Sequence, residues 1–502
     1  MIGHLNAPPT MPTATPDPAA PLRRITDLPG PRGLPGLGQL LQLDPPRFHQ
    51  QLEGWCRAHG PLYQLRFGRQ RVLVVGDHAL VAGVLRDRPE GFRRPALHAA
   101  IGQEMGLPGS VFRSEGAAWA RQRRMVMAGL DPTHVRGYYP SLLAVAQRLA
   151  GRWQRAALAG QTIDLQADLM RYTVDAVAGL TFGAEVNTLD SDGDVIQQHL
   201  DKVFPALYRR ALSPLPYWRW LRLPADRQLD RSVAAINAAV AVFIDQARTR
   251  LHADPQRRAQ PPNLLEAMLV AADEPDSGID DEQVAGNVVG MLLAGEDTTA
   301  NTLAWMIHLL WRHPLALARA TEELRRVVPE DSEPTLDQLA RLEVLEACAH
   351  ETMRLKPVAP QIPLQALRDT VVGGVRVPAG AVLIGLLRMD SVSDAHLPQA
   401  DRFEPGRWLA GGAGAGAVGA AAGAVKRVAM PFGAGPRICP GRYLALLEMR
   451  MAMAQLLGRF DIDTVFVADD DGQAGESDGE AAERLSFTMA PVGLRMRLRL
   501  RG

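Results

Sequence analysis

The sequence predicts a mainly α-helical protein with small β-sheets, and three observations support this fold class. Helical periodicity dominates from about residue 117 to residue 345. Within this region, the apolar segment from about Asp281 to His313 would form a helix of roughly 50 Å, long enough to cross a whole domain. Strand patterns are short and are limited to a hairpin-like stretch at 62–77 and a patch at 367–387.

In chain order, residues 1–27 are rich in proline, and we expect them to form a disordered tail. A turn-rich segment follows, and then a helix that we expect to end at Gly60. We expect residues 28–502 to form a single domain, because neither the flexible insert at 411–425 nor the acidic loop at 468–483 separates two chemically complete halves. A G-x-G-x-x-G match in the insert lacks a preceding strand, so we assign it no dinucleotide.

Composition excludes several functional classes. The formal net charge is zero, so no overall field favours nucleic acid as a partner. Three separated cysteines form neither a disulfide framework nor a tetrahedral zinc site, and we expect a cytoplasmic monomer. We find no signal-peptide pattern and no apolar stretch that would serve as a transmembrane anchor. Basic residues are almost all arginine, which together with abundant alanine and glycine indicates a bacterial source.

One cysteine, Cys439, lies in the glycine- and proline-rich stretch "PFGAGPRICPG". Because Pro440 suits the first position of the apolar helix that follows, we expect Cys439 at or just before a helix N-terminus, where backbone N–H groups favour a thiolate. Arg437 adds a fixed positive charge. The residues alone leave open a metal ligand, a nucleophile, or a buried structural cysteine, although no histidine follows His396 to act as a base.

This stretch closely resembles the haem-binding loop of the cytochrome P-450 family. The resemblance implies the P-450 fold, with a long central helix over the haem, and haem b (iron protoporphyrin IX) as cofactor. It also implies that Cys439 is the metal ligand, that Phe432 shields its sulfur and that Arg437 pairs with a haem propionate. The cofactor-binding positions of the loop are Phe432, Gly433, Arg437, Cys439 and Gly441, and the family pattern also fixes Gly435.

The middle of the long helix is similar to the family's Ala/Gly–Gly–x–Asp/Glu–Thr stretch, at Ala294, Gly295, Asp297 and Thr298. The resemblance implies that the helix opens beside Gly295 to admit dioxygen and water. It assigns Asp297 and Thr298 the catalytic role of delivering protons to dioxygen. Read without the family, Thr298 and its neighbour Thr299 would simply bond back to carbonyls one turn earlier.

Two further motifs match the family in the correct order. Glu351 and Arg354, joined by Arg407 from a downstream segment, resemble its structural Glu–Arg–Arg triad, although alone they would be read as an exposed ion pair. Trp119 and Arg123, spaced i and i+4, resemble its pair at a haem propionate; alone, they would be one buried aromatic residue and one solvated arginine.

One position departs from the family pattern. Where many relatives place a basic or hydroxyl side chain for the other propionate, this sequence has Gln365, with Arg368 three residues later. Arg121 and Arg124 are candidates for docking an acidic electron donor, but a plain solvated surface explains them equally well.

The resemblance implies a haem-thiolate monooxygenase that inserts one atom of O₂ into a lipophilic small molecule, most simply by hydroxylation. Electrons would come from a separate ferredoxin- or flavodoxin-type donor. We expect the substrate pocket at 92–112, 358–362 and 487–489. The alternatives are a peroxide-driven peroxygenase, a non-catalytic haem sensor or carrier, and a thiol enzyme without haem.

Overall fold

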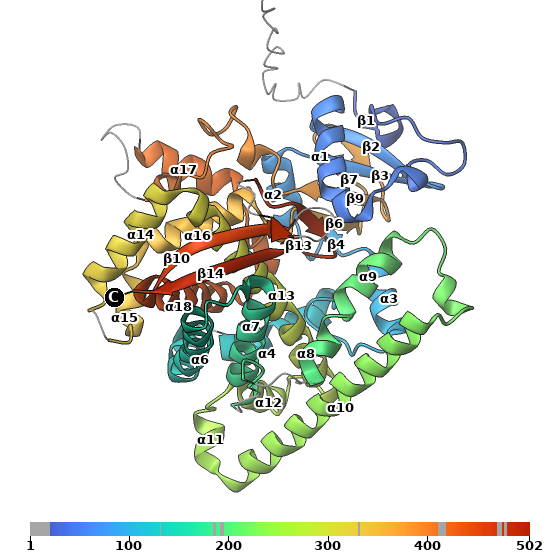
Figure 1. The fold of residues 1–502 in the computed structure, drawn as a ribbon. Coiled ribbons are helices and arrows are strands. Elements are labelled where there is room, and N and C mark those ends of the chain that lie inside the picture. Colours follow the sequence, from blue (N-terminus) through green and yellow to red (C-terminus); the bar gives the residue numbers. More distant parts are fainter. Residues whose placement is uncertain are drawn as a thin grey trace, which may run out of the picture.

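The computed structural model describes residues 21–130, 132–183, 187–190, 195–329, 332–409, 418–468, 474–475 and 479–501. Long helices form most of the molecule, and small sheets lie among and beside them (Figure 1), which confirms the predicted fold class. The longer helices are α1 (Phe48–His59), α2 (His78–Arg86), α3 (Ala96–Glu104), α4 (Gly116–Leu130), α6 (Tyr139–Leu158), α7 (Leu165–Phe182), α9 (Val203–Leu212), α10 (Pro224–Ala253), α12 (Leu264–Ala272), α13 (Asp281–Arg312), α14 (Pro314–Val327), α16 (Glu343–Leu355), α17 (Val418–Val428) and α18 (Arg442–Arg459). The short ones are α5 (Pro132–Gly137), α8 (Val195–Leu200), α11 (Pro255–Ala259) and α15 (Leu336–Ala340), with 3₁₀ turns η1 (Ile25–Asp27), η5 (Asp390–Val392), η6 (Pro405–Trp408) and η7 (Gly435–Arg437) among others.

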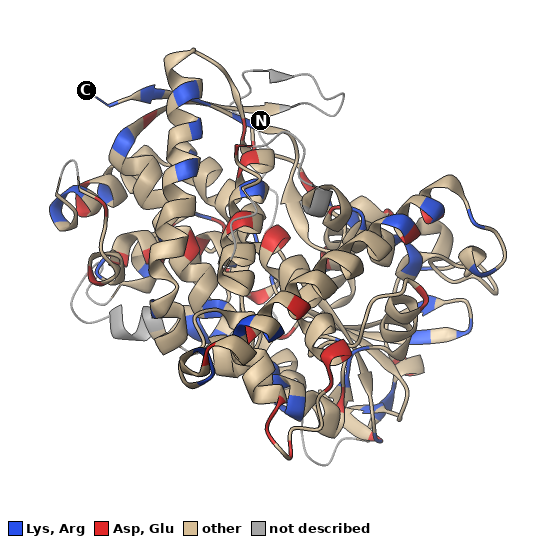
Figure 2. Cartoon of the chain, turned by 90° about the horizontal axis from the view of Figure 1, so that it is seen from below, with Lys and Arg blue, Asp and Glu red and all other residues tan. Residues whose placement is uncertain are grey.

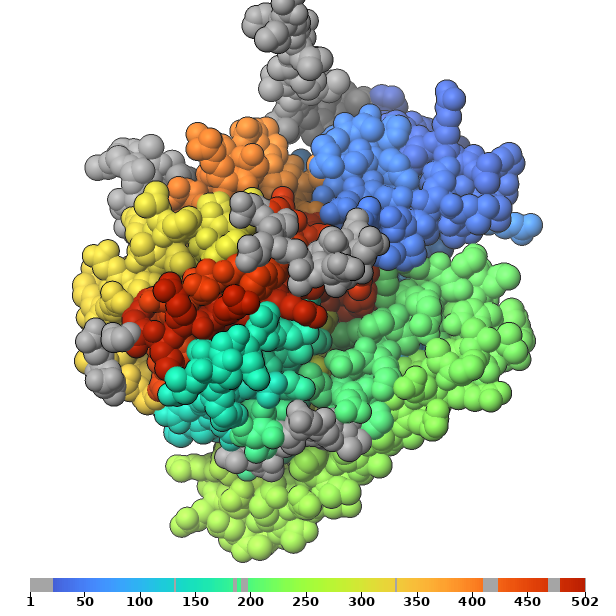
Figure 3. All heavy atoms as spheres, viewed as in Figure 1, coloured from blue at the N-terminus to red at the C-terminus, as the bar shows by residue number. Residues whose placement is uncertain are grey.

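Four small sheets flank the helices. The largest has the order β2-β3-β9-β6-β4, with β3 parallel to β9 and its other pairs antiparallel. The sheet β11-β10-β14-β5 lies on the surface between α6 and α7 on one side and α14 and α16 on the other (Figure 3). The strands are β1 (Arg23–Arg24), β2 (Leu62–Phe67), β3 (Gln70–Val75), β4 (Phe92–Arg93), β5 (Ile163–Asp164), β6 (Gln361–Ala366), β7 (Thr370–Val372), β8 (Val375–Val377), β9 (Val382–Leu386), β10 (Phe460–Ala468), β11 (Ala474–Gly475), β12 (Glu483–Leu485), β13 (Met489–Pro491) and β14 (Leu494–Leu500).

The central helix α13 follows the bounds expected from its sequence. Asp280 caps it by accepting a hydrogen bond from the Gln283 amide at 2.8 Å, and Pro314 opens the next helix directly after it. Most of its side chains are buried, because α7, α10, α12, α16 and α18 all pack against it. Two of its glycines permit close packing: a Cβ at Gly286 would lie 1.9 Å from the carbonyl oxygen of Gly109, between α3 and α4, and one at Gly295 would lie 2.6 Å from Val177 of α7.

The expected tail is wrong at its C-terminal end. Residues 1–20 lie outside the described residues, but Arg23 and Arg24 pair with β8, and Ile25 is buried in the apolar cluster beneath the largest sheet. The expected flexible insert is also wrong over 418–425, which belongs to α17 and ends in a buried Val425. Burial of single apolar side chains orders both segments despite their low-complexity composition.

Acidic and basic residues are interspersed along the elements of the fold (Figure 2), in keeping with a net charge of zero. Within the described ranges, no helix is both long and apolar enough to span a membrane.

Candidate active site

A backbone hydrogen bond and two glycines in the left-handed conformation define the shape of the cysteine loop. The Cys439 amide donates to the Phe432 carbonyl oxygen at 3.0 Å, and Gly433 and Gly435 have φ of 75° and 72°. A Cβ at Gly435 would lie 2.6 Å from the carbonyl oxygen of Leu85, so only glycine allows this close contact with the end of α2. Phe432 packs on the edge of the main core.

The helix after the cysteine begins later than expected. α18 starts at Arg442 with Gly441 as its N-cap, so Pro440 is not in its first turn and Cys439 lies three residues upstream. Burial raises the pKa of the Cys439 thiol, against the opposing effects of the Gly441 amide, Arg123 and Arg442. The expected lowering of this pKa is therefore wrong, and a thiolate here needs a further positive charge, such as a coordinated metal ion.

Arg437 lies between the loop and α4. Its guanidinium donates to the Ser114 carbonyl oxygen at 2.6 Å and to the carboxylate of Glu115, and it lies 4.7 Å from the ring centroid of Trp119. Arg123, one turn further along α4, is close enough to Cys439 for each to affect the other's pKa. The structure therefore brings Trp119, Arg123, Arg437 and Cys439 into one neighbourhood.

Two arginines that the sequence analysis missed join this group. Arg88 is 3% exposed, and its Nε and one terminal nitrogen have no partner among the described residues. Burial and the neighbouring arginines lower the pKa of Arg88 to about 10 and that of Arg94 to about 9. Burial and Arg94 lower the pKa of His98 to about 4. No sequence motif marks these positions, which come together only through folding.

This chemistry fits haem. Glu115 is the only carboxylate that acts on Arg88, Arg94 and Arg437 in the described structure, and buried cations without counter-charges are costly. Two propionates would supply the missing negative charge, and Cys439 supplies a thiolate ligand for iron. Ala294, midway along α13, is exposed although Leu293 and Glu296 beside it are buried.

Both residues of the expected proton-delivery pair are engaged in hydrogen bonds. The Thr298 hydroxyl donates to the Ala294 carbonyl oxygen at 2.6 Å, as the reading without the family proposed. Asp297 accepts from Asn301 at 2.8 Å and from the hydroxyl of Thr488, and burial raises its pKa. The helix stays continuous, so the expected opening beside Gly295 is wrong, and this glycine instead permits close packing on Val177.

Two buried carboxyl groups near this segment were not singled out from the sequence. Glu296 is 3% exposed, and burial together with Asp201 raises its pKa well above the ordinary value. Glu448 of α18 faces Thr299, and burial raises its pKa to about 8. Both carboxyls therefore hold a proton at a pH where an exposed glutamate has lost it.

The structure also brings the predicted triad together. Arg354 donates to both carboxylate oxygens of Glu351 at 2.7 and 2.8 Å, and Arg407 Nε lies 3.4 Å from the same carboxylate. Arg354 also donates to three carbonyl oxygens of the segment 391–402. Trp408, which the sequence analysis missed, donates to Glu351 at 2.9 Å. These bonds anchor the chain that leads into the cysteine loop.

The three segments expected to form a substrate pocket meet. Phe487 lies 6.2 Å from Phe112 between ring centroids, and the Met489 amide donates to the Val358 carbonyl oxygen at 2.8 Å. Phe204 of α9, which the sequence analysis missed, stacks on Phe487 at 4.4 Å. The result is an aromatic cluster formed by Phe112, Phe204 and Phe487.

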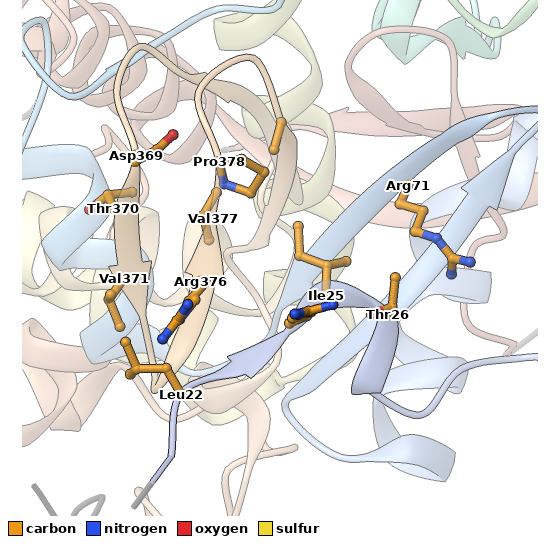
Figure 4. Close-up of a pocket in the computed structure, with 12 residues that line it drawn as sticks. Leu22, Ile25, Thr26, Arg71, Asp369, Thr370, Val371, Arg376, Val377 and Pro378 are labelled. Atoms are coloured by element: carbon orange, nitrogen blue, oxygen red, sulfur yellow. The ribbon is translucent and has the colours of Figure 1, made fainter. Parts of the chain in front are cut away.

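At the position that departs from the family pattern, Gln365 and the nearby Arg368 both bind protein side chains. Gln365 accepts from Arg93 at 3.1 Å, and Arg368 pairs with Asp87 on the surface at 2.7 Å. A cavity of about 650 Å³ (Figure 4) lies between β1, β7 and β8, and none of its lining residues belongs to α13 or the cysteine loop. We therefore do not assign this cavity to the reaction.

Comparisons with known proteins agree with this geometry. The family model for cytochrome P450 matches residues 28–473. A Streptomyces melanosporofaciens protein named cyclooctat-9-en-7-ol 5-monooxygenase is 30% identical, over 89% of this chain and 92% of that protein. An Arabidopsis thaliana carotene epsilon-monooxygenase is 27% identical, over 82% and 76%. The solved heme domain of cytochrome P450DA has a TM-score of 0.77 at 25% identity, over 96% of this chain and 98% of that one.

Proposed function

The chain belongs to the cytochrome P450 family and is a haem b-dependent monooxygenase, and we propose that it hydroxylates a lipophilic small molecule. Bound haem supplies the iron at which dioxygen is cleaved, and a thiolate ligand favours that cleavage. One oxygen atom enters the substrate and the other leaves as water, which consumes two electrons and two protons. The observation that carries the proposal is Cys439 in a left-handed glycine loop beside three arginines that share the single carboxylate of Glu115 in the described structure.

We assign the haem-binding residues on the same basis. Cys439 would provide the thiolate ligand, while Arg437, Arg88 and Arg94 would neutralise the propionates. Trp119 would hold Arg437 in place through its ring, and Arg123 would favour the thiolate electrostatically. The Glu351 triad would fix the loop from behind.

Asp297 and Thr298 would handle protons. Asp297 is partly buried and its pKa is raised, which suits a carboxyl group that accepts and returns protons. The Thr298 hydroxyl donates its hydrogen bond to the Ala294 carbonyl oxygen. Because a hydroxyl rotates, it would also be able to donate that proton to another acceptor once this bond is broken. Glu296 lies next to Asp297 in the chain and would hold a reserve proton.

The aromatic cluster supports a lipophilic substrate. Phe112, Phe204 and Phe487 come from three separate segments, and Thr488 connects this cluster to Asp297. The names of two relatives refer to cyclooctat-9-en-7-ol and to carotene, both of which are largely hydrocarbon. We therefore place the substrate against these rings.

We propose a separate, acidic electron donor of the ferredoxin or flavodoxin type. Arg86 and Arg124 are exposed near the cysteine loop, and Arg442, directly after it, is partly exposed. Positive side chains at this surface suit an acidic protein partner. Charge reversal at Arg124 should slow reduction by such a donor and leave chemical reduction unchanged.

The experiment that tests the proposal follows the absorption spectrum of the purified protein, reduced and exposed to carbon monoxide. We expect the main peak at the position typical of thiolate-ligated haem, and we expect Cys439→Ser to lose it. A peak at the position of imidazole-ligated globins would contradict the proposal. A panel of terpenoids, steroids and fatty acids would then identify ligands that shift the haem spin state. Turnover with peroxide alone that exceeds turnover with electron donors would favour a peroxygenase.

A further inference from the structure

Two histidines and one aspartate meet on the side of the molecule where α2 begins. His78 is the first residue of α2, Asp390 is the first residue of η5, and His396 follows η5 in the chain. His78 Nδ1 lies 2.7 Å from one carboxylate oxygen of Asp390, and His396 Nε2 lies 3.4 Å from the other. One ligand atom from each of the three residues can be chosen so that all lie within 4.8 Å of one another. The three residues therefore converge on one point from separate parts of the chain.

We propose that His78, Asp390 and His396 bind a divalent transition-metal ion of the zinc class. Two imidazole nitrogens and one carboxylate oxygen are a common donor set for Zn²⁺, and water would complete the tetrahedron. The side chains are 21%, 18% and 23% exposed, so an ion can reach them from solvent. The imidazole rings meet edge to face with centroids 4.9 Å apart, and one nitrogen of each ring faces an oxygen of Asp390.

The surroundings hold the ligands in position. The backbone amide of His78 donates to the Asp390 carboxylate at 2.8 Å and so orients it. Hydrogen bonds to the ligand residues commonly hold them in place at metal sites. Ser391, next to Asp390, accepts a hydrogen bond from the buried Arg354 through its carbonyl oxygen. The amide of His396 donates to the Ser393 carbonyl oxygen at 3.0 Å. A site on such anchored elements loses little conformational freedom when an ion binds.

The ion would join two parts of the molecule that meet at the cysteine loop. α2 starts at this cluster, and its last turn is the element that Gly435 approaches closely. η5 starts at the same cluster and continues into the chain held by the Glu351–Arg354 pair. Bound zinc would therefore stabilise the position of α2 against the loop. The inference depends on these contacts alone and stands whether or not the proposed substrate class is correct.

The test uses untagged holoprotein, with zinc binding measured by calorimetry and by competition against a chromophoric chelator. We expect one equivalent of Zn²⁺ to bind and to raise the thermal unfolding midpoint by a few degrees. His78→Gln and His396→Gln should each weaken binding by more than about tenfold, because even supporting residues of a metal site contribute that much. The matched control is His252→Ala, since His252 is an exposed histidine at the end of α10, and it should bind as the parent does.

Two outcomes would overturn the inference. One is equal zinc affinity in the parent, the His78 variant and the His396 variant, which would mean that zinc binds elsewhere. The other is no binding to the parent at millimolar zinc, with the Soret band showing folded holoprotein; Asp390 would then serve only to hold the start of α2 through its hydrogen bonds. The asparagine variant Asp390→Asn separates the cases, because its amide oxygen can still accept from the His78 amide but lacks the charge that favours a cation.

Discussion

Thr488 donates its hydroxyl to the carboxylate of Asp297, and this bond joins the turn between β12 and β13 to the middle of α13. Phe487, the neighbour of Thr488, has a φ of 100° and stacks on Phe204. A non-glycine residue with this backbone angle is held there by its surroundings. A substrate that moves Phe487 would therefore move the partner of Asp297 as well.

The first prediction concerns this bond. Thr488→Val should raise the pKa of Asp297 further, because the Thr488 hydroxyl lowers that pKa by binding the carboxylate. We expect the pH profile of turnover to move to higher pH and the product formed per electron to fall by about tenfold, which is less than the loss of a proton-transfer group itself because Asp297 remains. Thr488→Ser should restore both. If Val and Ser variants share one pH profile, Thr488 serves only in packing.

A second prediction concerns Arg88, two of whose guanidinium nitrogens have no hydrogen-bond partner in the described structure. Arg88→Met should stabilise the haem-free protein by about 1–4 kcal/mol, the range seen when buried ionic groups are replaced by apolar ones. The same change should speed haem loss to an apoglobin acceptor, because a propionate loses a cation. The control is Arg124→Met at an exposed position, which should alter neither quantity. A variant that loses stability without haem would show that Glu115 already compensates the charge of Arg88.

A third prediction is that alanine substitutions at two glycines of the loop change the free energy of unfolding by different amounts. Gly435→Ala should destabilise the haem-free protein by at least about 1–3 kcal/mol, because φ is 72° and the Cβ would overlap the Leu85 carbonyl oxygen. Gly441→Ala should be nearly neutral there, because φ is −84° and a Cβ would meet no protein atom within 4 Å. Denaturant unfolding of both haem-free variants checks the contrast. Equal losses would contradict it.

The raised pKa of Glu448 predicts that the free energy of unfolding depends on pH. Its pKa is about 8 in the folded protein and 4.5 in its unperturbed state, so the folded protein keeps a proton that the unfolded chain releases. The contribution of Glu448 to the free energy of unfolding is therefore fully present below about pH 4.5. It is lost as the pH rises toward 8, by roughly 1.4 kcal/mol for each pH unit. Glu448→Gln should remove this loss. Melting curves of the two proteins should separate with rising pH, and parallel curves would show that Glu448 is ionised in the folded state.

Features that depend on contiguous residues can be predicted from the amino-acid sequence alone. Cys439 and its glycines lie in a single stretch, and α13 is bounded by an acidic cap and a following proline, so local pattern was enough for both. The same local pattern predicts too early a start for α18 and a disordered tail over residues 23–27, and both predictions are wrong. In both cases the missing information was what the segment packs against.

Folding establishes which residues that are distant in the sequence share a site. Arg88 and Arg94 reach Arg437 across more than 300 residues of chain, Thr488 reaches Asp297, and His78 reaches Asp390. The direction of the Cys439 pKa was decided in the same way, because burial outweighs the nearby amide and arginines. Sequence spacing sets geometry only over a few turns of chain, whereas desolvation and charge pairing depend on which atoms the folded chain brings together.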